Sequence, residues 1–137
     1  TEISLSGTLE PHWNTGYKLA WTYTQPKTSD DTQIPSSVRQ VWQADIHTSP
    51  LAGLTTGIGF SAAVGRSHYA ASPYSKYDNY YNLRWYAQYA VNESLTLHIG
   101  VENITNQKYV TEGHYADPNY SFISAGTTIH AGCTLHF

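Results

Sequence analysis

The chain has few charged residues and a single cysteine. Asp, Glu, Lys and Arg make up 12% of its 137 residues, against about 25% in an average soluble domain. The net charge of −3 argues against a nucleic-acid-binding protein, which is normally basic. One cysteine excludes an internal disulfide framework and a cysteine-rich zinc site. No run of about 18 apolar residues is present, so the sequence predicts no transmembrane helix.

What the sequence does contain is aromatic residues, 14% of the chain, and a two-residue alternation of apolar and polar side chains. This alternation is typical of β-strands, because successive side chains of a strand point to opposite faces. It predicts an all-β chain of seven antiparallel strands in one domain, residues 1–137. The predicted strands cover residues 2–9, 17–24, 42–47, 54–64, 81–91, 94–102 and 128–137.

The connections between the predicted strands alternate in length. Short, turn-like connections lie at residues 10–14, 49–53 and 92–93. Longer ones, rich in Pro, Ser, Asp, Asn and Tyr, lie at residues 25–37, 68–79 and 105–125. We therefore expect tight hairpins at one end of the sheet and long loops at the other.

The polar face of the predicted strands consists mostly of Ser, Thr, Gly, Asn, Gln and His. A soluble sheet would carry more Lys, Glu and Asp on its water-facing side. Long strands, a polar interior and unequal connections favour an antiparallel transmembrane β-barrel. Aromatic residues near strand ends fit the girdles of such a barrel, namely Trp13, Tyr17, Trp42 and Tyr89. Two alternatives stay open: a soluble β-sandwich that binds carbohydrate or protein, and a small passive outer-membrane barrel with one strand missed.

The odd strand count indicates a segment of a larger barrel. Bacterial single-chain barrels have an even number of strands. An open seven-stranded sheet would leave backbone groups unpaired in lipid. The chain contains no methionine and starts within a predicted strand, so we expect it to come from a longer protein.

The stretch from Gly100 to Tyr109 and the terminal phenylalanine resemble the C-terminal end of TonB-dependent outer-membrane receptors, of the siderophore or cobalamin type. In that family a strand runs into an Asn-Leu-(Thr/Phe)-Asp-x-x-Tyr motif, and a loop and a final strand ending in Phe follow. The matching residues are Asn103, Ile104, Thr105, Lys108, Tyr109 and Phe137.

The resemblance implies a barrel of about twenty-two strands that encloses a plug domain, with this chain as its C-terminal part and the plug outside it. It implies a bacterial outer-membrane receptor, not an enzyme, that imports a scarce nutrient, most often a ferric siderophore, with energy from TonB. The implied partners are the remaining N-terminal strands and plug, the TonB complex through that plug, membrane lipid and a metal-chelate ligand. Neither a cofactor nor nucleic acid is implied, and the three long connections would be extracellular.

Candidate functional residues follow from position and face. Ligand-binding candidates in the long loops are Tyr69, Tyr74, Tyr77, Tyr115 and Tyr120. Residues expected to face the lumen or the plug are Lys18, Asp45, Arg84, His98, Glu102 and His130. Residues resembling the signal read by the barrel-assembly machinery are Ile129, Leu135 and Phe137. The seven histidines show no tight ligand spacing, so the sequence predicts no metal site.

Overall fold

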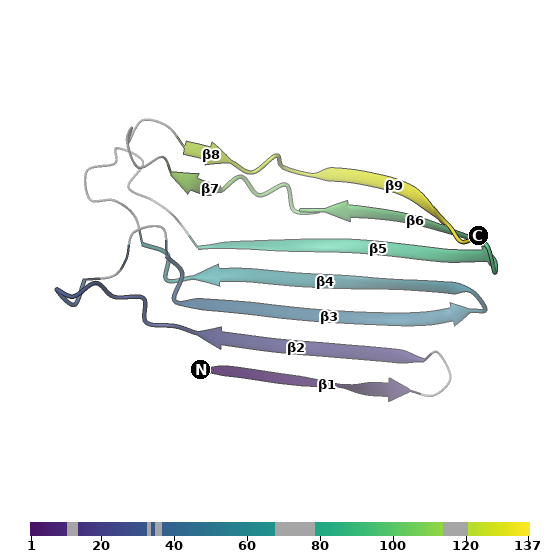
Figure 1. Ribbon diagram of the computed structural model, residues 1–137, viewed down its shortest axis with the longest axis horizontal. Coiled ribbons are helices and arrows are strands. Elements are labelled where there is room, and N and C mark those ends of the chain that lie inside the picture. The colour runs from purple at the N-terminus through teal and green to yellow at the C-terminus, as the bar shows by residue number, and fades with distance from the viewer. Residues whose placement is uncertain (11–13, 33, 35–36, 68–78, 114–120) are drawn as a thin grey trace.

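The computed structural model is one antiparallel sheet of seven long strands with a short separate hairpin (Figure 1). It describes residues 1–10, 14–32, 34, 37–67, 79–113 and 121–137. The long strands are β1 (Glu2–Glu10), β2 (Thr15–Tyr23), β3 (Gln40–Leu51), β4 (Leu54–Val64), β5 (Tyr80–Asn92), β6 (Leu95–Glu102) and β9 (Thr128–Leu135). They pair in that order, which confirms the predicted fold class. No helix among the described residues is long and apolar enough to cross a membrane.

A short hairpin interrupts the connection between β6 and β9. Its strands are β7 (Val110–Gly113) and β8 (Ser121–Ile123), which pair with each other and not with the large sheet. The sequence predicted one long connection over residues 105–125 and did not predict the two short strands within it. Strands of three or four residues are too short to show a clear two-residue alternation.

The two ends of the sheet differ, as predicted. At the end that we call the turn end, residues 52–53 join β3 to β4 and residues 93–94 join β5 to β6. Gly53 has a φ of +78°, which glycine adopts at no steric cost. The described residues of the longer connections and the N-terminus lie at the opposite end, the loop end, whereas the C-terminus lies at the turn end (Figure 1).

Cross-strand register aligns residues of like character into rows. One row contains Leu5, Leu19, Ala44, Phe60 and Leu83. Because paired residues share a face of the sheet, these rows form a continuous surface that we call the apolar face. The opposite surface, which carries Asp45, is the polar face.

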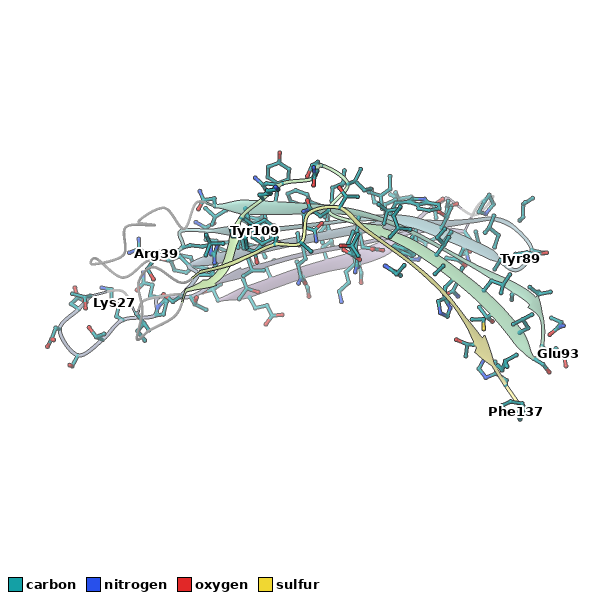
Figure 2. All side chains as sticks on the ribbon, turned by 90° about the horizontal axis from the view of Figure 1, so that it is seen from above. Lys27, Arg39, Tyr89, Glu93, Tyr109 and Phe137 are labelled. Carbon is teal, nitrogen blue, oxygen red and sulfur yellow. The ribbon has the colours of Figure 1, made fainter. Side chains whose placement is uncertain are left out.

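No described residue covers the apolar face. Figure 2 shows the sheet from above as one curved layer. In the middle of the sheet Ile46 and Ile58 are 51% and 53% exposed, and Ala63 is the one apolar residue buried among those described. Exposed apolar surface costs about 25 cal/mol per Å² in water. The apolar face therefore requires an apolar environment or partner.

Candidate functional site

Asp45, in β3, is the centre of a polar cluster formed with His47, Arg84 and Tyr86, the Asp45 cluster. The Tyr86 hydroxyl donates a hydrogen bond to Asp45 Oδ1 at 2.9 Å. His47 Nδ1 lies 3.3 Å from the same oxygen, and Arg84 Nη2 lies 3.6 Å from Oδ2. The Asp45 side chain is only 22% exposed. These partners offset the cost of withdrawing a carboxylate from water.

Two glycines of β4 allow β5 side chains to reach Asp45. Strand β4 lies between β3 and β5, and Gly59 stands opposite both Asp45 and Arg84. A Cβ at Gly59 would overlap the Arg84 side chain, and one at Gly57 would lie 2.5 Å from the Tyr86 hydroxyl oxygen. The Asp45 cluster therefore requires glycine at both positions.

We expect Asp45→Ala to lower the free energy of unfolding by about 2–3 kcal/mol, because it removes the charged acceptor of the Tyr86 hydrogen bond. The partly exposed ion pair with Arg84 adds less than about 1 kcal/mol. A double-mutant cycle with Tyr86→Phe, measured by chemical unfolding in lipid vesicles, should give a coupling energy of about 1–2 kcal/mol. Gln43→Ala, on the same face of β3, is the matched control. Strictly additive losses for Asp45→Ala and Tyr86→Phe would contradict this interaction.

Lys18 and Glu102 lie on the polar face with the Asp45 cluster. Lys18 is paired with Asp45 in the register of β2 and β3, and the Asn82 amide donates to Glu102 Oε2 at 3.4 Å. Together with Asp45 and Arg84 they line a hollow of about 620 Å³. The structure thus brings four predicted lumen-facing residues to one surface. Their contact with a plug stays a prediction.

His98 and His130 also lie on the polar face, on β6 and β9. Each imidazole lies over a glycine of the neighbouring strand, His98 over Gly132 and His130 over Gly100. In the part of the chain that the structure describes, no three His, Cys, Asp or Glu side chains are grouped to hold a metal ion. We assign these two histidines to packing on the sheet surface.

The motif that begins at Asn103 forms a tight turn at the end of β6. Asn103 has a φ of +52° and is 4% exposed. Its Oδ1 accepts a hydrogen bond from the Gln107 backbone N–H at 3.0 Å, and its amide donates to the Gln107 carbonyl at 2.8 Å. Its own backbone N–H donates to the Asn82 side chain at 2.8 Å, and the Thr127 hydroxyl donates to its carbonyl at 2.9 Å. Asn103 therefore connects β5, β6 and the segment before β9.

Tyr109, at the end of the same motif, joins an aromatic stack at the loop end. Its ring lies parallel to that of Tyr80, with 4.0 Å between centroids. The Arg66 guanidinium lies 5.0 Å from the Tyr80 ring centroid and donates to the Val110 carbonyl at 2.6 Å. The stack therefore ties the ends of β4 and β5 to the start of β7.

Burial raises the pKa of Tyr109, and the neighbouring Tyr80 raises it further against an opposing effect of Arg66. The neutral phenol is therefore favoured in the folded protein. The neutral Tyr109 phenol stabilises the folded protein fully below the ordinary tyrosine pKa of about 10. This stabilisation is lost as the pH rises through the higher pKa that Tyr109 has in the folded protein. Subtracting the tyrosinate absorbance of Tyr109→Phe from that of the parent isolates the ionisation of Tyr109. We expect the midpoint of this ionisation to lie above a pH of about 10. A midpoint at or below that value would contradict the burial of Tyr109.

The predicted barrel-assembly residues lie on or just beyond β9. Ile129 and Leu135 are 70% and 55% exposed on the apolar face of β9, and Phe137 is fully exposed beyond the end of that strand. Their part in barrel assembly stays a prediction. Outside the described residues lie Trp13, Tyr69, Tyr74, Tyr77, Tyr115 and Tyr120.

Sequence reasoning missed several residues of these contacts. Tyr86 and His47 have the same strand parity as Arg84 and Asp45, so their face was predictable, but their meeting with Asp45 was not. Tyr80 and Arg66 gave no sequence signal, because each stands at a strand end beside a long connection.

No protein-family model matches the chain, and neither does any curated protein. Among solved structures, it is similar to the ferric-catecholate import receptor Fiu from E. coli K12 in its closed form, with a TM-score of 0.69 and 18% sequence identity. The match covers 99% of this chain and 20% of that one, so this chain spans about a fifth of the receptor's length. At 18% sequence identity, this similarity shows the fold alone. The seven-stranded antiparallel sheet of this chain therefore has the fold of part of that receptor.

Proposed function

We propose that this chain is part of the transmembrane barrel of an outer-membrane transport receptor and is not an enzyme. One observation carries the proposal: an uncovered apolar face and a hollowed polar face run in continuous rows across seven strands. A soluble sandwich would cover the apolar face with a second sheet. In a membrane barrel lipid covers that face, and further strands pair with the open edges of β1 and β9.

The transported nutrient that we propose is a metal chelate, most simply a ferric siderophore. The motif at Asn103 to Tyr109 supports a TonB-dependent receptor, and the fold likeness to a ferric-catecholate import receptor supports this ligand class. The remaining barrel strands and a plug domain would complete the receptor. The plug would lie against the polar face and would couple uptake to the TonB complex.

Uptake by cells that express the full receptor carrying this chain tests the proposal. We expect accumulation of a ferric catecholate that stops when the receptor gene is deleted, when TonB is inactivated or when a protonophore is added. Accumulation that needs neither TonB nor the proton gradient would favour a passive barrel instead. Recovery of the protein in the soluble fraction without detergent would refute the membrane assignment itself.

A further inference from the structure

Tyr80 and Tyr109 form the tightest ring pair among the described residues. Their rings are parallel, with an interplanar angle of 2° and 4.0 Å between centroids, whereas aromatic pairs in proteins usually have centroids about 4.5–7 Å apart. The other ring pairs of the described residues each include a tryptophan or phenylalanine and have centroids 5.7–6.5 Å apart. Tyr80 and Tyr109 are therefore the one pair of described phenol rings in face-to-face contact.

The backbone holds both tyrosines in this position. Tyr80 is the first residue of β5 and is paired with β4. The Tyr109 N–H donates to Ser124 Oγ at 3.2 Å, and the Tyr109 carbonyl accepts from the Ser124 N–H at 2.9 Å. The Arg66 guanidinium contacts the Tyr80 ring and donates to the carbonyl of Val110, the neighbour of Tyr109. The two rings are thus placed together before any reaction, which is the condition for fast coupling of two groups.

Both tyrosines are half-buried, and Tyr109 lies toward the loop end of the sheet, away from Phe137 (Figure 2). A small oxidant can therefore reach the rings, and water can accept protons from their hydroxyl groups. The stack combines two oxidisable phenols, contact between their rings and access from solvent.

We infer that Tyr80 and Tyr109 are a modification site, at which oxidation joins the two rings as dityrosine. The oxidant is hydrogen peroxide, acting through a peroxidase or a redox-active metal ion. One electron leaves each phenol, and each hydroxyl proton passes to water. The two phenoxyl radicals then form a carbon–carbon bond between ring positions ortho to the oxygens.

The reaction is balanced by the reduction of the peroxide. The hydrogens at the two newly bonded ring carbons move through water to the phenolic oxygens, so both rings regain their hydroxyls. Peroxide takes up the two electrons and two protons lost by the tyrosines and becomes two molecules of water.

The crosslink would connect the start of β5 to the segment before β7 by a covalent bond. These segments are otherwise joined by weaker contacts, such as the hydrogen bond from the Tyr81 N–H to Gln107 Oε1 at 2.9 Å. A carbon–carbon bond persists when hydrogen bonds break, so it would keep the β7–β8 hairpin tethered to the sheet during local unfolding. The site does not depend on the proposed transport function.

Peroxidase treatment of the full protein that carries this chain, folded in detergent, tests the site. After a limiting amount of hydrogen peroxide, tryptic peptides are analysed by mass spectrometry. We expect residues 77–84 to be linked to the peptide that begins at Tyr109, with the summed mass less two hydrogen atoms. Fragment ions should place the link at Tyr80 and Tyr109. This link should form before any other tyrosine pair of the chain is joined, because its rings are already in contact.

Tyr80→Phe and Tyr109→Phe each keep two stacked rings and remove one phenol, so each should abolish the linked peptide pair. Tyr81→Phe is the matched control, because Tyr81 lies in the same tryptic peptide but its ring contacts Phe60. This variant should give the parent's yield of the link. Heat-modifiable gel mobility verifies that each variant is folded.

Three outcomes would overturn the crosslinking site. One is folded parent protein in which peroxidase forms no link between Tyr80 and Tyr109. Another is an equal yield of the link from protein unfolded in urea, which would mean that the stack plays no part. The third is loss of the linked peptides in Tyr81→Phe and their retention in Tyr80→Phe. The proposed transport function would stand in all three cases, because uptake tests it separately.

Discussion

Replacing Ile46 with arginine should destabilise the protein in lipid vesicles by about 2–4 kcal/mol, the usual cost of a basic side chain on the lipid face of a barrel near mid-membrane. Ile46 lies in the middle of β3, on the apolar face, and is 51% exposed. An arginine there would place its charge among the apolar rows of β2 and β4. The free energy of unfolding from vesicles, measured by chemical denaturation, and the fraction of heat-modifiable protein both report this effect.

Gln43→Arg is the matched control, because it introduces the same side chain into the same strand on the polar face. The hollow on that face contains water-exposed polar groups, including Gln43 itself, so we expect a change within about 0.5 kcal/mol. Equal stability of Ile46→Arg and Gln43→Arg would mean that the apolar face does not meet lipid.

Asn103→Ala should lower the free energy of unfolding by about 3–4 kcal/mol. The change removes two side-chain hydrogen bonds to the Gln107 backbone, each worth about 1 kcal/mol. It also forces a residue with a Cβ and no local hydrogen bond to keep a φ of +52°, at a cost of about 1–2 kcal/mol. Chemical unfolding in vesicles measures the loss.

Two further variants at position 103 separate these causes. Asn103→Gly keeps the backbone conformation at no steric cost, so it should lose only the hydrogen-bond contribution. Asn103→Asp keeps the acceptor for the Gln107 N–H and loses the amide donor, so it should fall between the parent and alanine. If alanine and glycine unfold at the parent's stability, the side chain of Asn103 does not hold the turn.

The alternation of residues such as Leu97, His98 and Ile99 was sufficient to predict the seven long strands and their faces, but not the short strands β7 and β8. In an extended backbone, the direction of each side chain depends only on the position of its residue along the strand. Lys18, Asp45, Arg84 and Glu102 were therefore assigned to one face from sequence alone, and the structure places them there.

The contacts within the Asp45 cluster could not be predicted in the same way. Tyr86 and Asp45 are 41 residues apart and come from strands that are separated by β4. Their meeting depends on the register of two successive strand pairs and on the absence of side chains at Gly57 and Gly59. A shift of one residue in either pair would turn Tyr86 to the other face.

By itself, the sequence determined a charge-poor, two-faced antiparallel sheet with tight turns at one end and long loops at the other. These are local properties of residue alternation and turn chemistry. The pairing of β9 with β6 and the connection of three segments by the Asn103 turn follow from the folded chain and not from any local pattern. Such contacts depend on cross-strand register, which all the strands must satisfy together.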